Sequence, residues 1–340
     1  MPASAIPQGS VVLVTGVNGY IGSHTVDQLL FAGYKVRGTV RDPSRARWVQ
    51  ALFDQKYGSG KFELFVVPKM NVDGAFDEAV KGVSGVVHVA SNTSLSPDPN
   101  AVIPEVINGA VGILKSASRE SSVKRVVYTS SSVTTGFVLP NTPVITTHDS
   151  WNDLASTLAW APPPYEAERK WIVYAASKTE AERACWKFVE EEKPRFEFNT
   201  VLPSVNFGAP LHEGPASETL IWLKTLVKGD LEAAKKEGLA PNWFIDVSDS
   251  ARLHVAALVN PTVKSERVFG HSQPFNCSDV LDILRKAYPD RSWPSNIPDE
   301  PRDLSAIERR ERSLELLKGL GRDGFISLED SVKSVGAPAI

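Results

Sequence analysis

Cysteine and methionine are both scarce in this chain, with two residues of each among 340. The cysteines, Cys185 and Cys277, form no CxxC pair, so we expect neither a disulfide framework nor a zinc ribbon, and a reducing compartment. The six histidines show no HExxH or similar paired spacing, so the sequence predicts no metal site. The chemistry of this protein is therefore expected to rest on other side chains.

Long apolar runs and an excess of one charge are missing as well. No apolar stretch approaches the ~20 residues of a membrane-spanning helix, and residues 1–10 lack the charged and apolar regions of a signal peptide. The formal net charge is -3 and the isoelectric point is about 6.1, which argues against a nucleic-acid or membrane-surface binder. We expect a cytoplasmic protein whose partners are neither nucleic acid nor membrane.

Short β-branched segments alternate with helical segments through the first 130 residues. The predicted strands are 11–16, 34–40, 62–67, 85–90 and 125–130, and the predicted helices are 24–31, 45–57, 75–81 and 106–119. Strands that are apolar throughout and alternate with helices are typical of an α/β protein with a parallel sheet covered on both faces.

The alternation becomes irregular after residue 132. A helix is predicted over about 172–192 and a strand over 196–203, and alternation returns at 242–271. We expect residues 1–203, with a return segment at about 241–273, to form one domain. Residues 204–240 and 274–340 are expected to form a smaller, interleaved lobe.

The first motif is TGVNGYIG at residues 15–22, where a predicted strand ends and a helix begins. Gly16, Gly19 and Gly22 permit a tight turn and close approach of a ligand, and the helix N-terminus offers free N–H groups to a pyrophosphate. An ordinary strand–turn–helix is the simpler alternative, but the strand before and the helix after favour a dinucleotide site. YGSGKF at 57–62 does not match a P-loop.

The stretch KVRGTVRDPSRAR at 35–47 carries five basic side chains. In a site for NAD, an acidic residue about 20 positions after the glycines binds the ribose hydroxyls. Here Arg41 ends the second strand, with Arg45 close behind, and a guanidinium suits the 2′-phosphate of NADP. Two alternatives stay open: a solvated basic helix start, and a ribose contact from the adjacent Asp42.

The second motif is YAASK at 174–178, within a predicted helix. Residues four apart share one helix face, so Tyr174 and Lys178 can meet one ligand. The pattern alone is weak, because Tyr57 and Lys61 match it across a Gly-Ser-Gly turn. TSSS at 129–132 leaves the fifth strand at the edge where ligands bind in α/β sheets.

In this order, TGxxGxxG, HVAS at 88–91, TSSS, YAASK and VLPSVNFG at 201–208 resemble the extended short-chain dehydrogenase/reductases. The nearer resemblance is to fungal NADPH-dependent aldehyde and ketone (carbonyl) reductases and to plant dihydroflavonol reductases. It implies a Rossmann-type doubly wound sheet in residues 1–203, NADP(H) as the cofactor and an oxidoreductase. It also implies Ser131, Tyr174 and Lys178 as catalytic residues, although Ser130 and Ser132 flank the serine.

Further roles follow from the same resemblance. Hydride passes to the substrate carbonyl carbon, Ser131 and Tyr174 hydrogen-bond the carbonyl oxygen, and Tyr174 gives the proton, helped by Lys178. Lys69 stands where the family has an Asp that binds adenine, so adenine must be held in another way. The residues expected to bind the cofactor are Gly16, Asn18, Gly19, Tyr20, Ile21, Gly22, Arg41, Arg45, Met70, Val89, Ala90, Ser91, Thr129, Tyr174, Lys178, Pro203 and Val205.

The substrate is expected to be an apolar or aromatic aldehyde or ketone. Residues 204–251 contain no arginine that could bind a diphosphate, and they are rich in apolar side chains. Trp222 matches by position an aromatic residue of the fungal reductases, so we expect it, with Ser131, to contact substrate. Lys224 and Lys228 keep a phosphate-bearing substrate open.

Two rival functions remain on the same fold. A nucleotide-sugar epimerase or dehydratase would share Tyr174 and Lys178, and a non-catalytic NADP-binding regulator would need only the glycine turn. The retained Ser131, Tyr174 and Lys178 argue against the regulator. A monomer or a homodimer is compatible with the sequence.

Overall fold

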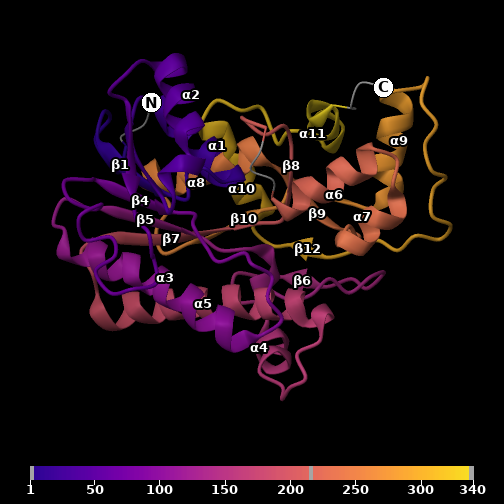
Figure 1. Cartoon of the computed structure of the whole chain (residues 1–340), viewed down its shortest axis with the longest axis horizontal. Coiled ribbons are helices and arrows are strands. Elements are labelled where there is room, and N and C mark those ends of the chain that lie inside the picture. Colours follow the sequence, from indigo (N-terminus) through magenta and orange to yellow (C-terminus); the bar gives the residue numbers. More distant parts are fainter. Residues whose placement is uncertain (1–3, 214–216, 337–340) are drawn as a thin grey trace.

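The computed structural model describes residues 4–213 and 217–336, and its centre is a seven-stranded parallel sheet (Figure 1). The strand order is β10-β7-β5-β4-β1-β2-β3. The strands are β1 (Val11–Thr15), β2 (Lys35–Val40), β3 (Phe62–Val66), β4 (Gly85–His88), β5 (Arg125–Thr129), β7 (Glu197–Pro203) and β10 (Arg267–Gly270). The predicted α/β fold with a doubly wound parallel sheet is confirmed.

Helices cover both faces of this sheet (Figure 1). One face carries α1 (Tyr20–Phe31), α2 (Arg47–Tyr57), α8 (Val247–Val259) and α10 (Arg310–Gly319). The other carries α3 (Pro99–Arg119), α4 (Asp153–Ala159) and α5 (Lys170–Glu192). Within the described residues, none of these helices combines the length and apolar character that a bilayer crossing needs.

The alternation of side chains along each strand builds the two halves of the core. In β1, Val12 and Val14 pack against α1, α2 and α8, whereas Leu13 points to the opposite face and packs against α3. All three side chains are fully buried. Because both faces are covered, the interior positions of the central strands are apolar on both sides, which is the continuous pattern seen in the sequence.

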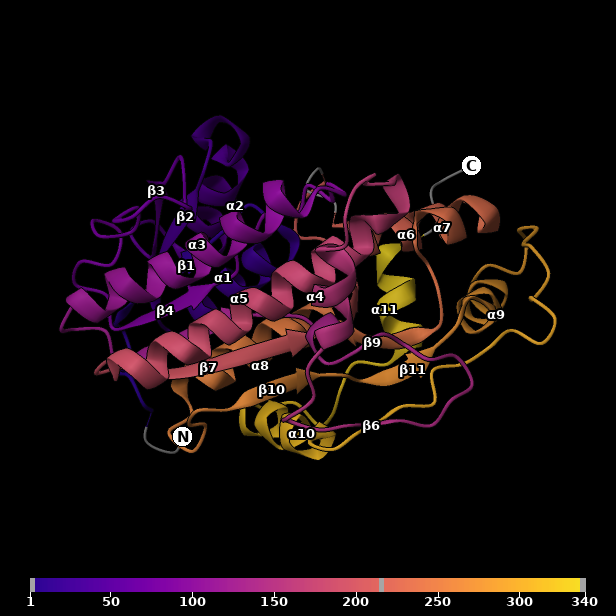
Figure 2. The same cartoon turned by 90° about the horizontal axis from the view of Figure 1, so that it is seen from below.

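A smaller lobe lies beyond the carboxyl ends of the strands (Figures 1 and 2). Its sheet has the order β11-β9-β8, with β8 (Val205–Phe207), β9 (Asn242–Asp246) and β11 (Gln273–Phe275). Its helices are α6 (Glu218–Val227), α7 (Leu231–Glu237), α9 (Cys277–Ala287) and α11 (Leu328–Val335), and a parallel ribbon pairs β6 (Ile145–Thr146) with β12 (Ala306–Ile307). The core of this lobe includes Phe207, Trp222 and Phe275.

The exact division into two domains stays a prediction, and α10 bears on it. This helix lies within 274–340 but packs its Leu316 and Leu317 into the core beneath α1, α2 and α8. The Ser313 hydroxyl donates to the Phe269 carbonyl of β10 at 2.6 Å. The C-terminal segment therefore crosses from the lobe to the large sheet and back.

Some predicted elements were wrong. Residues 75–81 form turns instead of a helix, because the segment is short and lies between Gly74 and Gly82, both with positive φ. The helix predicted at 106–119 begins at Pro99, where Asp98 caps it. The helix predicted from residue 45 begins at Arg47, after a 3-10 turn capped by Asp42.

Candidate active site

The site begins between β1 and β4, where the strand order reverses direction. The Thr15 hydroxyl accepts hydrogen bonds from the backbone N–H groups of Val89 and Ala90, each at 3.0 Å, and pairs with His88 Nδ1 at 2.9 Å. These bonds hold the 89–91 segment against the glycine turn. The expected cofactor residues that follow β4 and those of the 15–22 motif are thus brought together at the carboxyl edge of the sheet.

The glycine turn has no room for side chains. Gly16 has φ +70°, and a Cβ on it would lie 3.1 Å from the Ala90 Cα. A Cβ on Gly22 would lie 2.2 Å from the Gly16 carbonyl oxygen. Gly19 caps α1 without a side-chain hydrogen bond, so the first N–H groups of the helix face the turn uncapped. This geometry fits a pyrophosphate.

Two buried polar atoms near this edge also fit a polar ligand. The Ser91 Oγ and the Asn206 Oδ1 have no hydrogen-bond partner within the described part of the chain. Buried polar groups are almost always hydrogen-bonded, so such atoms indicate an absent partner. Ser91 follows the segment that Thr15 holds, and Asn206 lies on β8, next to the expected cofactor residue Val205.

The basic stretch separates into structural and exposed residues. Arg37 is engaged with Glu63 and with the carbonyls of Ala79 and Lys81. Asp42 uses its carboxylate to accept from the Ser44 N–H at 2.9 Å and hydroxyl at 2.7 Å, bonds that lower the pKa of Asp42. The Arg41 and Arg45 side chains are exposed beside it, at the end of β2.

The expected adenine end shows Lys69 exposed and Met70 half-buried. The Met70 side chain lies beside Gly109 of α3, within ordinary contact of a Cβ built there. At the other end of the expected site, Pro203 ends β7 and Val205 begins β8. Tyr20 donates to the Gly208 carbonyl and so ties the start of α1 to the loop after β8. Ile21 is half-buried.

Ser131 and Tyr174 meet at the end of β5. The Ser131 side chain hydrogen-bonds Tyr174; burial raises the pKa of this tyrosine and the serine bond opposes that rise. Ser130 instead donates to Glu182 at 2.6 Å, and Ser132 lines a cavity described below. Among the three consecutive serines, Ser131 is the one that contacts Tyr174.

Lys178 lies one turn after Tyr174 on α5 and is almost fully buried. Its ammonium donates to the Thr129 carbonyl at 2.6 Å and to the Tyr128 hydroxyl at 3.3 Å. Burial lowers the pKa of Lys178 to about 8, while the nearby Glu182 carboxylate acts in the opposite direction. The Thr129 hydroxyl is paired with His254 at 2.8 Å.

The second YxxxK match has a different environment. α2 ends at Tyr57, and Gly58 follows with φ +86°, so Tyr57 and Lys61 share no helix face. The Tyr57 hydroxyl donates to Asp27 at 2.8 Å. This tyrosine fastens α2 to α1.

A cavity of about 380 Å³ is lined by Ser132 and Trp171, which lie next to the catalytic candidates. It lies between the loop that follows Ser131, the first turn of α5 and the start of β9. Trp171, one turn before Tyr174, packs its ring edge against the Tyr174 ring with centroids 6.2 Å apart. The aromatic lining residues are Phe137, Trp171, Trp243 and His271.

Trp222 lies behind this lining. Its ring contacts Trp171 edge-on, with centroids 5.5 Å apart, and only 9% of its surface is exposed. Phe207 and Leu226 are fully buried in the core of the lobe, whereas Leu220, also fully buried, packs with Tyr20 and Val247. In this structure Trp171 stands between Trp222 and Tyr174.

Comparisons with known proteins place the chain in a family. Residues 12–270 match the model of the NAD dependent epimerase/dehydratase family. The chain belongs to this family. Among its relatives, the chain is 41% identical over 338 residues to aldehyde reductase 2 of Sporidiobolus salmonicolor, covering 98% of this chain and 96% of that protein. It is 40% identical over 338 residues to ketoreductase adrE of Penicillium rubens, covering 96% of each.

A solved structure of the same family aligns over nearly the whole chain. The yeast methylglyoxal/isovaleraldehyde reductase Gre2, complexed with NADPH, matches with a TM-score of 0.79 and 26% identity, covering 96% of both chains. The predicted resemblance to extended short-chain dehydrogenase/reductases and to fungal aldehyde and ketone reductases is confirmed.

Sequence reasoning missed several residues of the site. Trp171 could have been predicted as a site residue, because it lies three residues before Tyr174 on the same helix face. Phe137, Trp243 and His271 come from distant segments, and no local pattern links them. Glu182 lies four residues after Lys178 and could have been read as part of the same helix stripe.

Proposed function

We propose that this protein is an NADPH-dependent oxidoreductase that reduces aldehydes or ketones to alcohols. The main support is the contact between Ser131 and Tyr174 beside the buried Lys178, at the edge of the sheet that also holds the glycine turn. The relatives named aldehyde reductase and ketoreductase, with 40% identity or more over nearly the whole chain, support it. An epimerase would share Tyr174 and Lys178, but the relatives with 40% identity or more are named reductases, which favours reduction.

The cofactor of this proposal is NADP(H). The glycine turn and the uncapped start of α1 would hold its pyrophosphate, and Arg41 with Arg45 would bind its 2′-phosphate. Met70 and the 89–91 segment would contact the adenosine, and Pro203, Val205 and Lys178 the nicotinamide riboside. When bound, NADPH supplies the reducing equivalent for the carbonyl carbon.

The residues of the chain stabilise charge and supply the proton. Negative charge develops on the carbonyl oxygen during reduction, and the Ser131 and Tyr174 hydroxyls would donate hydrogen bonds to it. Tyr174 would then release its proton to that oxygen. Burial opposes this step because it raises the pKa of Tyr174. The Lys178 ammonium favours the tyrosinate, as any nearby cation does.

The substrate of this proposal is an apolar or aromatic aldehyde or ketone. The cavity beside Tyr174 is walled by Phe137, Trp171 and Trp243, which suits a flat or bulky apolar group. Trp222 would shape this wall from behind. We further propose a cytoplasmic monomer or homodimer in which 1–203 and the 241–273 return segment bind cofactor and 204–240 with 274–340 bind substrate.

The test is NADPH oxidation, followed by its absorbance, against a panel of aliphatic aldehydes, aryl ketones and sugar nucleotides. We expect turnover with aryl ketones or aldehydes and none with sugar nucleotides. Conversion of sugar nucleotides alone would favour the epimerase alternative. NADPH binding with no turnover on any carbonyl compound would favour the regulator.

A further inference from the structure

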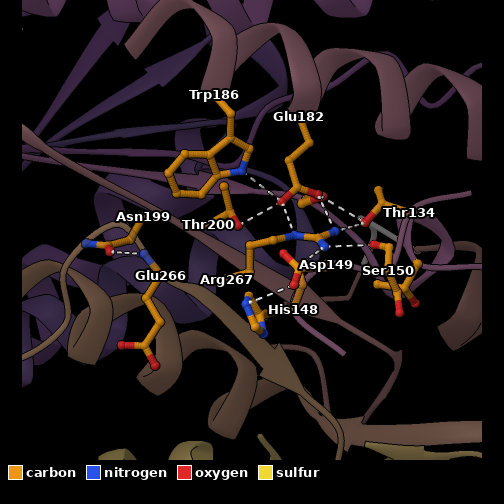
Figure 3. A network of polar contacts seen from close by, with 12 residues as sticks. Thr134, His148, Asp149, Ser150, Glu182, Trp186, Asn199, Thr200, Glu266 and Arg267 are labelled. Carbon is orange, nitrogen blue, oxygen red and sulfur yellow. Dashed lines mark hydrogen bonds and ion pairs between the residues drawn. The ribbon is translucent and has the colours of Figure 1, made fainter. Parts of the chain in front are cut away.

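A buried carboxylate lies one turn beyond Lys178 on α5. Glu182 is fully buried and accepts hydrogen bonds from side chains of several elements (Figure 3). The donors are Ser130 at 2.6 Å, Arg267 at 2.8 Å, Thr200 at 2.9 Å, Thr134 at 3.0 Å and Trp186 at 3.3 Å. Burial alone raises the pKa of Glu182, but Arg267 and the hydroxyl donors outweigh it and hold the pKa below its ordinary value. Glu182 is therefore ionised at neutral pH.

Arg267 completes this centre from β10. Its guanidinium pairs with both Glu182 oxygens and donates to the carbonyls of His148 at 2.7 Å and Ser150 at 2.8 Å. Its carbon Cζ lies 4.0 Å from the centroid of the Trp151 ring. The pair thus joins α5, β7, β10 and the 148–151 segment, as Figure 3 shows.

The Glu182 carboxylate also holds the loop that carries Ser131 through hydrogen bonds. Ser130 precedes Ser131 and donates to Glu182, and the single hydroxyl proton of Thr134 is shared between Glu182 at 3.0 Å and the Ser131 carbonyl at 2.9 Å. Ser131 is therefore held from both sides of its own backbone. Its hydroxyl, which contacts Tyr174, therefore sits on a backbone tied on both sides to one residue, Glu182, of α5, the helix that also carries Tyr174.

Glu182 also sets the charge around Lys178. The titratable groups that face Lys178 from β4, β5, α8 and α5 are His88, Tyr128, His254, Tyr174 and Cys185. Burial lowers the pKa of His88 to about 3 and of His254 to about 4, and it raises the pKa of the two tyrosines and the thiol. All five groups are uncharged near pH 7. Of Glu182 and Cys185, the two groups that raise the pKa of Lys178, Glu182 is the negatively charged one, and Arg267 is its partner.

We infer that Glu182 is a positioning residue for the reduction, which fixes the Ser131 loop and keeps Lys178 protonated in its buried site. The inference rests on the proposed function of Ser131, Tyr174 and Lys178. Loss of the carboxylate would free the serine loop and would also leave Lys178 beside an uncompensated Arg267. Both changes oppose proton delivery from Tyr174.

The experiment compares Glu182→Gln, which keeps the shape and removes the charge, with Glu182→Asp, which keeps the charge. In Glu182→Gln we expect kcat to fall by about 100-fold, as a misplaced catalytic group can cause. We also expect the alkaline limb of kcat/KM to move down by about one pH unit, because Lys178 loses its proton more readily. Glu182→Asp should keep the limb in place.

A readout without turnover accompanies the kinetics. The Lys178 Nζ resonance of lysine-labelled protein, assigned with Lys178→Arg, should titrate about one pH unit lower in Glu182→Gln than in the parent. If the parent reduces no carbonyl compound, the proposed function fails, but the effect of Glu182 on the Lys178 titration can still be measured. An unchanged Lys178 titration in Glu182→Gln would overturn the charge role.

The matched control is Glu266→Gln, one residue from Arg267. Glu266 is buried too, but it pairs with Arg312 on α10, away from the serine loop. Glu266→Gln should move neither the alkaline limb nor the Lys178 resonance. Ser130→Ala is the milder variant if Glu182→Gln does not fold. It should lower kcat about tenfold with unchanged KM for NADPH; parental kcat in Ser130→Ala would overturn the loop-positioning role.

Discussion

At the scale of single residues, the neighbours of a side chain decide its role more than its type does. Tyr57 and Tyr174 each begin a YxxxK sequence. Tyr57 donates to Asp27 at 2.8 Å and ties two helices, whereas Tyr174 hydrogen-bonds Ser131 at the carboxyl edge of the sheet. The three serines at 130–132 differ in the same way, since Ser130 turns to Glu182 and Ser131 to Tyr174.

Tyr174→Phe is expected to lower kcat by about 100-fold or more, because the ring stays and only the proton-donating hydroxyl is lost. NADPH binding, measured by fluorescence titration, should remain close to that of the parent. Tyr57→Phe is the matched control and should keep the parental kcat. Near-parental turnover in Tyr174→Phe would refute the proton-donor role.

At the scale of elements, the ends of strands and helices present the groups that select ligands. β2 ends next to Arg41, and Asp42 turns its carboxylate back to cap the following 3-10 turn. The Asp42 carboxylate, which could otherwise bind ribose hydroxyls, is therefore occupied by hydrogen bonds from Ser44. Arg41 and Arg45 are exposed beside this occupied carboxylate, and their guanidinium groups suit a phosphate.

Arg41→Ala should raise the KM for NADPH about tenfold or more, the size of one lost charge-assisted hydrogen bond, and change the KM for NADH little. Steady-state kinetics with both cofactors measure this difference. The parent itself should prefer NADPH. Equal use of NADPH and NADH by the parent would contradict the assignment of Arg41.

The first turn of α5 and the middle of α6 bring two tryptophans together at the wall of the cavity. Trp171 lines the cavity, and Trp222 packs edge-on against it. Trp171→Ala should raise kcat/KM for the bulkiest aryl ketones relative to acetophenone-sized ones, since the wall beside Tyr174 recedes. Trp222→Ala should shift the enantiomer ratio of the alcohol product through Trp171.

Chiral chromatography of the products and kcat/KM across a ketone series check both tryptophan variants. Trp160→Ala is the control, because this side chain is 45% exposed at the end of α4. Unchanged selectivity in both Trp171→Ala and Trp222→Ala would show that the cavity does not receive the substrate.

At the scale of the whole molecule, buried histidines link the fold to pH. His88 on β4, His254 on α8 and His271 after β10 are buried, and burial is the main cause that lowers their pKa values to about 3, 4 and 3. In the unfolded chain a histidine has a pKa near ~6.5. The folded state therefore binds fewer protons than the unfolded state below that pH.

The contribution of these histidines to the free energy of unfolding should thus be complete above about pH 7 and should fall as the pH drops toward 4. Each histidine contributes about 1.4 kcal/mol per pH unit in that window, or about 4 kcal/mol per unit for the three. Urea unfolding between pH 7 and 5 measures the slope. His254→Gln should reduce it by roughly one third; an unchanged slope would contradict the neutral burial of His254.

The local pattern was sufficient for the sheet and for the cofactor turn. β-branched runs that are apolar at every position need two covered faces, and three glycines between a strand and a helix leave few alternatives to a ligand-binding turn. The helix period placed Tyr174 and Lys178 on one face and the strand end placed the 129–132 hydroxyls at the ligand edge, but the resemblance to the reductases gave Ser131, Tyr174 and Lys178 their predicted roles. The local pattern failed at 75–81, where apolar spacing suggested a helix but flanking glycines favour turns.

Only the tertiary structure determined which distant groups complete the site. Glu182 is hydrogen-bonded by Ser130, Thr200 and Arg267, which come from three other parts of the chain. Trp171 contacts Trp222, which lies 51 positions further along the sequence. The return of α10 to the large sheet is equally non-local. Helix and strand periods describe neighbours within a few residues along the chain. The burial of a charge, the closure of a cavity and the pKa of Lys178 depend on neighbours in space, which packing alone supplies.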